Sequence, residues 1–226
     1  MSRVEGVERL LRNVPKTVCY EVLMAGDQPD DKLMPEEVSA ISERAAALRR
    51  ESFRLGRTAA RNALAQLGAG RPAVAVGRHR EPLWPKDVVG SITHVGSCAI
   101  AAVAWKRDIA GIGIDLEMRR GFEGLRRSVA FGGELGWLAA LDAEEAESAT
   151  IEVFAAKEAI FKAFYPRIGR FFGFDSATLE PAVPRHHYLG RLTEGLVDEY
   201  PASRSFRIDV GWHRDLVLAT LVLEAD

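Results

Sequence analysis

Helix-type and strand-type patterns follow one another along this chain twice in the same order. A helical stretch from about 36 to 67 ends at Gly68 and Gly70, and an apolar hairpin with its turn around 95–97 follows it. A strand at 109–120 leads into helices at roughly 134–141 and 143–164, and strand patterns fill 174–225. This order predicts an α+β (α/β) fold of two halves with antiparallel sheets, 1–108 and 109–226, packed as one unit.

The bulk properties exclude several classes of protein. A length of 226 residues suffices for a sizeable core, and a net charge of −2 argues against general nucleic-acid binding. Cys19 and Cys98 lie far apart without metal-ligand spacing, which is typical of a reducing compartment. The first 22 residues mix charges and lack the apolar region of a signal peptide, and no stretch predicts a membrane span. We therefore expect a cytoplasmic protein.

The segment GIGIDLE (111–117) places two acids on one side of a predicted strand. Asp115 and Glu117 alternate with apolar residues, so the two residues lie on one side of the strand, about 6.5–7 Å apart along the backbone. Their carboxylates can close on one hard cation such as Mg²⁺. Gly113 on the same side is expected to leave room for a ligand. The competing interpretation is a pair of solvent-facing acids.

Two further segments carry groups suited to phosphates. Thr93 and His94 end an apolar strand before a glycine turn, where a histidine either holds a phosphate or serves as a structural hydrogen-bonding group. Arg50, Arg54, Arg57 and Arg61 form a helical stripe bordered by Arg49. For most of these arginines we expect a solvated face, although such a concentration of guanidinium groups also suits anionic oxygens.

The run FAAKEAIFKAF (154–164) places charges within an apolar helix. Lys157, Glu158 and Lys162 share one broad helix face with Phe154 and Phe161. Glu158 and Lys162 have the spacing of a favourable surface ion pair, worth only about 0.2–0.5 kcal/mol. Arginines, carboxylates and lysines together nevertheless predict handling of a pyrophosphate-bearing substrate, provided that they meet in space.

These segments, taken in order, resemble those of the 4′-phosphopantetheinyl transferases of the enterobactin-synthase component D or surfactin type. The ordered set is RRESFRLGR, PLWP leading to GSITH, GIGIDLE, FAAKEAIFKA and FFGFDSATL, and it covers nearly the whole chain. The resemblance implies a fold of two similar α/β halves related by a pseudo-twofold, a monomer, and coenzyme A in the cleft between the halves. It implies transfer of 4′-phosphopantetheine from coenzyme A to a serine of a carrier protein, with release of adenosine 3′,5′-bisphosphate.

The resemblance also implies roles for single residues. Asp115, Glu117 and Glu158 would bind Mg²⁺, and Glu158 or Glu117 would accept the serine proton. Lys157 and Lys162 would contact the phosphates, with Lys162 steadying the developing charge. The nucleotide would be held by Arg49, Arg57, Thr93 and His94. Some relatives carry a lysine before the PLWP-like segment where this chain has His79 and Arg80.

The expected partners are acyl or peptidyl carrier domains of nonribosomal peptide, siderophore, polyketide or fatty-acid synthases. Apolar residues after the GIGIDLE strand either contact such a carrier or pack in the core: Phe122, Leu125, Phe131 and Trp137. Two other functions compete with transfer. One is a Mg²⁺-dependent nucleotide-pyrophosphate hydrolase, and the other is a non-catalytic coenzyme A-binding subunit.

Overall fold

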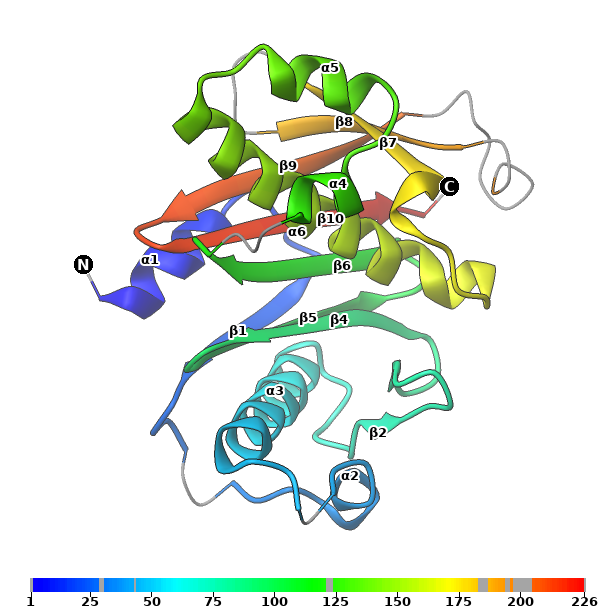
Figure 1. The fold of residues 1–226 in the computed structure, drawn as a ribbon. Coiled ribbons are helices and arrows are strands. Elements are labelled where there is room, and N and C mark those ends of the chain that lie inside the picture. Colours follow the sequence, from blue (N-terminus) through cyan, green and yellow to red (C-terminus); the bar gives the residue numbers. More distant parts are fainter. Residues whose placement is uncertain are drawn as a thin grey trace.

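The computed structural model describes residues 2–28, 31–42, 44–120, 124–182, 187–193, 196 and 205–225. Its core has four layers: helix, three-stranded sheet, five-stranded sheet, helix (Figure 1). The first sheet has the order β1-β5-β4 and the second β6-β10-β9-β8-β7. Both are antiparallel, as predicted.

The elements fall into two sets, on either side of the expected boundary at the turn before β6. The first half contains α1 (Arg3–Leu10), β1 (Cys19–Met24), α2 (Pro35–Val38), α3 (Ala47–Gln66), β2 (Ala75–Val76), β3 (Pro82–Leu83), β4 (Val88–Val95) and β5 (Cys98–Trp105). The second contains β6 (Ile109–Met118), α4 (Leu125–Val129), α5 (Gly133–Ala139), α6 (Ala143–Ile168), a 3-10 turn (Phe174–Ser176), β7 (Ala177–Pro181), β8 (His187–Leu192), β9 (Phe206–His213) and β10 (Leu216–Glu224).

The hairpin β4–β5 is the centre of the first half, and its predicted turn is confirmed at Gly96 and Ser97. Side chains alternate between the two faces of a strand, and in β5 both faces are apolar. Ala99, Ala101 and Val103 pack against α3. The alternate residues pack against the second sheet, together with residues of α1 and β1. A small-residue strand thus lies between two cores.

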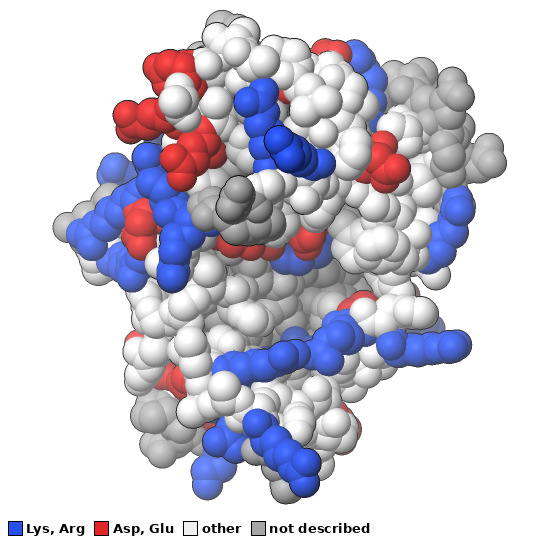
Figure 2. Space-filling model, in the orientation of Figure 1, with Lys and Arg blue, Asp and Glu red and all other residues white. Residues whose placement is uncertain are grey.

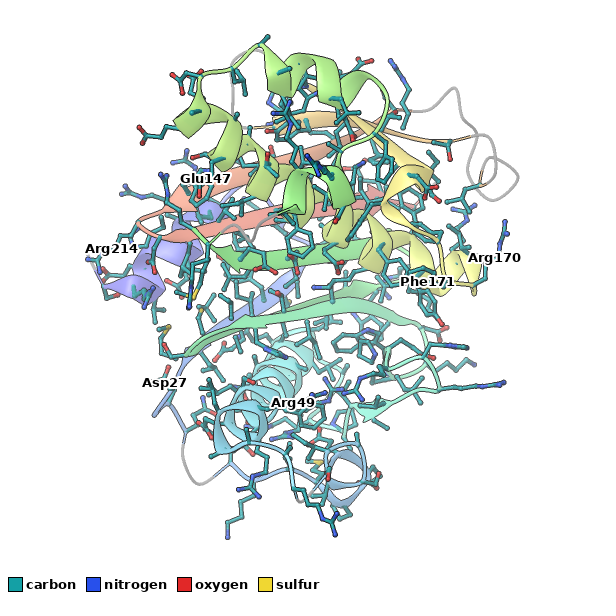
Figure 3. The ribbon with its side chains drawn as sticks, in the orientation of Figure 1. Asp27, Arg49, Glu147, Arg170, Phe171 and Arg214 are labelled. Carbon is teal, nitrogen blue, oxygen red and sulfur yellow. The ribbon has the colours of Figure 1, made fainter. Side chains whose placement is uncertain are left out.

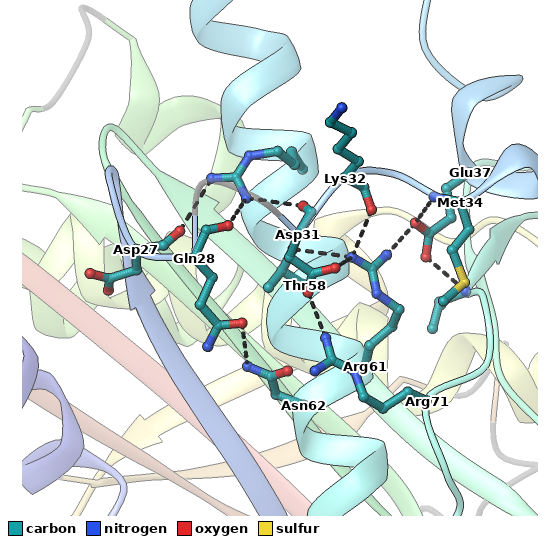
Figure 4. Close-up of polar contacts among 12 residues, drawn as sticks. Asp27, Gln28, Asp31, Lys32, Met34, Glu37, Thr58, Arg61, Asn62 and Arg71 are labelled. Carbon is teal, nitrogen blue, oxygen red and sulfur yellow. Dashed lines mark hydrogen bonds and ion pairs between the residues drawn. The ribbon is translucent and has the colours of Figure 1, made fainter.

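The predicted helical stretch 36–67 is two helices, α2 and α3, joined by a buried ion pair. Arg61 of α3 and Glu37 of α2 are both fully buried and bonded to each other (Figure 4). Arg61 also donates to Asp31, at 2.9 Å, and Glu37 accepts from the backbone N–H of Val74, at 3.0 Å. Arg61 therefore does not lie on the expected solvated face, because these acceptors surround it.

The GIGIDLE strand, β6, lies between the first sheet and α6. Ile112, Ile114 and Leu116 pack toward the first sheet. On the other side, a Cβ placed on Gly113 would lie 1.8 Å from the carbonyl oxygen of Ala159 in α6. The expectation that Gly113 leaves room for a ligand is wrong, because the backbone of α6 fills that space.

Helix α6 is longer than predicted and ends at Ile168 rather than near 164. Asp142 caps its first turn by accepting from the N–H of Glu145, at 2.8 Å, and Gly169 ends it at φ 68°. Helix α1 crosses the expected boundary, since Arg3 pairs with Asp215 in the β9–β10 turn at 2.7 Å. Within the described ranges, no helix is long and apolar enough to cross a membrane.

Candidate functional site

A cleft of about 830 Å³ opens between the segment from β2 to β4 and the second half of α6. Figure 2 shows the hollow across this face, with lysine and arginine side chains along its lower edge. His79, Arg80 and Trp84 line it from the first half, and Glu158 and Lys162 line it from α6. The structure thus brings together predicted residues that lie about 80 positions apart in the sequence.

Asp115 and Lys162 form the centre of the acidic part of the site. The Nζ of Lys162 donates to the Oδ1 of Asp115 at 2.6 Å and to the carbonyl of Ile114 at 3.1 Å. The Asp115 side chain is almost fully buried, and its Oδ2 has no hydrogen-bond partner in the described structure. A buried carboxylate oxygen without a donor is costly, and a bound cation would satisfy it.

Glu117 and Glu158 complete the acidic part, and the pKa of each is raised above its usual value. Burial, and then the charge of Asp115, raise the pKa of Glu117 to about 7. The same two causes, in the same order, raise the pKa of Glu158, while Lys162 opposes both shifts. These shifts indicate three carboxylates that share one poorly hydrated region.

The three carboxylates fit a divalent cation by their chemistry. Mg²⁺ prefers oxygen ligands, and both the unpartnered Oδ2 of Asp115 and the repulsion among the acids favour an added positive charge. In their present positions, the described residues include no group of three His, Cys, Asp or Glu side chains close enough to hold a metal ion. The metal site therefore stays a prediction.

Hydroxyl groups on β4 hold the acidic strand beside the first sheet. Thr93 accepts from the N–H of Leu116 at 3.0 Å and donates to Asp115 Oδ1 at 3.3 Å, and Ser91 accepts from the N–H of Ile114 at 3.1 Å. The Thr93 hydroxyl therefore positions Asp115 in this structure. The role of Ser91 was missed, because a serine in an apolar strand carries no distinctive pattern.

The basic part of the site is centred on Arg57. Its side chain is buried over the ring of Phe53, with the guanidinium carbon 4.5 Å from the ring centroid, and its Nε has no hydrogen-bond partner among the described residues. Burial lowers the pKa of Arg57 to about 10, and the charges of Arg61 and Arg80 contribute. A buried N–H donor without an acceptor is costly, and an anion would satisfy it.

His94 and Arg49 extend this basic part. His94 keeps part of its ring exposed, yet loss of hydration lowers its pKa, and the positive charges of Lys162 and Arg57 lower it further. Arg49 lies exposed in the first turn of α3, on the cleft side of the molecule in Figure 3. The charges of Lys162 and Arg57 thus both reach His94.

Lys157 lies elsewhere than the resemblance implies. Its Nζ donates to Glu134 Oε2 at 2.7 Å and to the carbonyl of Phe174 at 2.8 Å, and it lies 5.1 Å from the ring centroid of Phe131. Both charged side chains are 1% exposed. Because its donors are used in the core, Lys157 joins α6 to α5 instead of presenting its ammonium group to the cleft.

The apolar residues predicted for carrier contact pack mainly in the core. Leu125 is buried, Trp137 packs against the same core, and Phe131 lies beside Lys157, whereas Phe122 lies outside the described residues. Phe171 is 81% exposed after α6, where Figure 3 shows it near the end of that helix. Phe171 was not predicted, because no local pattern distinguishes it from the neighbouring Phe172, which is buried.

Two family models match most of the chain. Residues 36–104 match the 4′-phosphopantetheinyl transferase N-terminal domain, and residues 111–219 match the 4′-phosphopantetheinyl transferase superfamily. A solved holo-ACP-synthase from Plasmodium yoelii aligns with a TM-score of 0.40 at 18% identity, over 52% of this chain and 96% of that one.

Curated relatives give higher identity. The chain is 39% identical to the 4′-phosphopantetheinyl transferase Svp of Streptomyces mobaraensis, over 69% of this chain and 63% of that protein. It is 39% identical to Npt of Nocardia iowensis, over 67% and 68%, and 31% identical to PptT of Mycobacterium tuberculosis, over 93% and 96%. With two matched family regions and a relative covered almost end to end, this chain belongs to the 4′-phosphopantetheinyl transferase superfamily.

Proposed function

We propose that this protein transfers the 4′-phosphopantetheine arm of coenzyme A to a serine hydroxyl of a carrier-protein domain, with Mg²⁺ as the metal. The observation that carries the proposal is the meeting of Asp115, Lys162 and Glu158 at a cleft whose other wall holds Arg80 and His79. A pyrophosphate needs cations around its oxygens, and a metal needs carboxylates. This cleft offers both within one space.

The proposed reaction is a displacement at phosphorus. The serine oxygen forms a bond to the phosphorus that bears the pantetheine arm, and the bond from that phosphorus to the bridging oxygen breaks. Adenosine 3′,5′-bisphosphate leaves with the electron pair. In this proposal Lys162 stabilises the charge on the phosphate oxygens, and Glu117 or Glu158 accepts the serine proton. When bound at Asp115, Glu117 and Glu158, Mg²⁺ supplies positive charge beside the pyrophosphate.

The nucleotide end of coenzyme A would lie along the basic part of the site. Arg57 is the strongest candidate for the 3′-phosphate, because the Nε of its buried side chain has no hydrogen-bond partner among the described residues. His94, Arg80 and His79 would add donors, and Arg49 would contribute at the rim. Lys157 receives no phosphate contact in this proposal, since its side chain is buried in the core, whereas that of Lys162 lines the cleft.

The test is mass spectrometry of an apo-carrier protein after incubation with this protein, coenzyme A and Mg²⁺. We expect a mass gain equal to the phosphopantetheine arm, and no gain with a carrier whose serine is replaced by alanine. Consumption of coenzyme A with an unmodified carrier would instead indicate a pyrophosphate hydrolase. Metal-independent binding of coenzyme A without turnover on any carrier would indicate a non-catalytic subunit. A panel of nonribosomal peptide, polyketide and fatty-acid carriers would identify the acceptor class.

A further inference from the structure

A second cavity, of about 440 Å³, lies between the first half of α6 and the strands β8 and β9. It shares none of its described lining residues with the coenzyme A cleft. Glu152 faces it from α6, six positions before Glu158, which places the two carboxylates on different faces of the helix. A cavity of this volume is large enough for a small organic ligand.

Three aromatic side chains line this second cavity and are held in place by hydrogen bonds. The Nε1 of Trp212 donates to Glu152 Oε1 at 2.6 Å, and the hydroxyl of Tyr188 donates to Glu152 Oε2 at 2.5 Å. Trp137 lies beside Tyr188, with ring centroids 6.0 Å apart, and donates to the carbonyl of Leu179 at 3.2 Å. The polar edges of the rings are therefore occupied, and ring surface remains to line the cavity.

Glu152 carries the negative charge inside this second cavity. Glu152 accepts from two neutral donors, and no lysine or arginine of the described residues forms an ion pair with it. Glu144, exposed on the first turn of α6, adds a second acid at the rim. Figure 2 shows acidic side chains gathered on this side of the molecule, where Figure 3 labels the nearby Glu147.

The chain itself places a guanidinium group on one wall. Arg119, just after β6, lies with its guanidinium carbon 4.7 Å from the ring centroid of Trp212. Arg119 is exposed and also lines the cavity. The contact shows that this indole accepts a planar cation, as aromatic faces do in proteins that bind organic cations.

We propose that this cavity, formed by Trp137, Tyr188, Trp212 and Glu152, binds an organic cation with a guanidinium head group. The rings provide cation–π contacts, and the remaining lone pairs of the Glu152 carboxylate accept hydrogen bonds from the guanidinium. Arg119 competes for the face of Trp212 and repels the incoming charge. The ligand is either a free small molecule or an arginine side chain of a peptide.

The test is a titration followed by the indole N–H signals in ¹H–¹⁵N NMR. Four tryptophans give four signals. Agmatine should shift those of Trp137 and Trp212 and leave Trp84 and Trp105 unmoved. Butylurea, which is neutral, should shift none. Equal shifts with butylurea, or shifts confined to Trp84 in the coenzyme A cleft, would overturn the proposal, as would an absence of shifts at millimolar agmatine.

Matched variants separate the charge of Glu152 from general acidity. Glu152→Gln should weaken agmatine binding by about tenfold or more. Glu147→Gln, a change on the same helix outside the lining, should leave it unchanged. Glu144→Gln, on the exposed rim, should weaken it by about twofold and serves if Glu152→Gln does not fold. The site would be refuted if Glu152→Gln had no effect on agmatine affinity and the Glu144 and Glu147 variants bound agmatine equally well.

Arg119→Gln gives a prediction of opposite sign. Removing the competing guanidinium should tighten agmatine binding by about threefold or more. A decrease would mean that Arg119 belongs to the binding surface and would contradict the proposed competition. Titration with an arginine-containing tripeptide with blocked ends distinguishes the two sources of the guanidinium group. Tighter binding than agmatine indicates an arginine side chain, and weaker binding indicates a free cation.

Discussion

Gly113→Ala tests directly how this sequence builds its site. The added Cβ would lie 1.8 Å from the carbonyl oxygen of Ala159, 2.7 Å from its carbonyl carbon and 2.9 Å from the N–H nitrogen of Ala163. Real Cβ contacts are essentially never shorter than 3.0 Å, so α6 must retreat from β6 by about an ångström. All three atoms belong to backbone, and no side-chain rotation relieves the contact.

The expected loss of stability is about 3 kcal/mol or more, the upper part of the range for overpacked cores. For a chain of this length that corresponds to a fall in Tm of roughly 6–12 °C. Chemical denaturation and calorimetry measure it. Because α6 carries Glu158 and Lys162, the retreat also separates them from Asp115, and phosphopantetheine transfer should fall at temperatures where the variant remains folded.

Gly136→Ala is the matched control. Gly136 lies within α5, and a Cβ there meets no atom within 4 Å. Alanine is the better helix former, so this variant should gain about 0.5–1 kcal/mol. If Gly113→Ala were as stable as the unmodified protein, the direct packing of α6 on β6 would be refuted, and with it the account of why the strand carries glycine there.

Four further changes test the site. Glu158→Gln should keep the fold and reduce transfer by about 100-fold or more, since the acidic part loses a charge; near-normal turnover at saturating Mg²⁺ would remove Glu158 from the mechanism. Lys157→Met should cost about 3–5 kcal/mol by leaving Glu134 buried and unpaired, as measured by urea unfolding, and Glu134→Gln should cost a similar amount. A double-mutant cycle should show strong coupling between these two residues; a change confined to KM for coenzyme A, without loss of stability, would instead make Lys157 a phosphate contact. The pKa of His94, lowered in the free protein, should rise when adenosine 3′,5′-bisphosphate binds, because the phosphate favours the imidazolium; NMR titration measures it, and an unchanged or lower pKa would place the phosphate elsewhere.

The sequence predicted those features that depend on local periodicity. Alternation along 111–117 placed Ile112 and Ile114 on one side of β6 and Asp115 on the other, as the structure has them. The β4–β5 turn and the two helices after 133 were also found, because turn residues and helical spacing are local signals. The sequence allowed both acids to be placed on one strand, but it did not allow the groups that face them to be predicted.

The features that sequence analysis missed depend on partners distant in the chain. Glu134 lies 23 positions before Lys157, and Glu37 lies 24 positions before Arg61. Each of these residues reads as an ordinary charged side chain, because nothing local shows that an opposite charge will be buried beside it. The glycine at 113 posed the same difficulty, since free space for a ligand and space for a helix look alike in sequence.

The packing of α6 explains why the neighbouring residues Lys157 and Glu158 take different roles. Adjacent residues on a helix point about 100° apart, so Lys157 can turn into the core while Glu158 lines the cleft. Lys157 turns into the core, where Glu134 and the Phe174 carbonyl fix the rotation of α6 about its own axis. That rotation sets the direction of Glu158 and, one turn later, of Lys162 toward Asp115. In the proposed reaction, the buried lysine would therefore act by positioning Glu158 and Lys162.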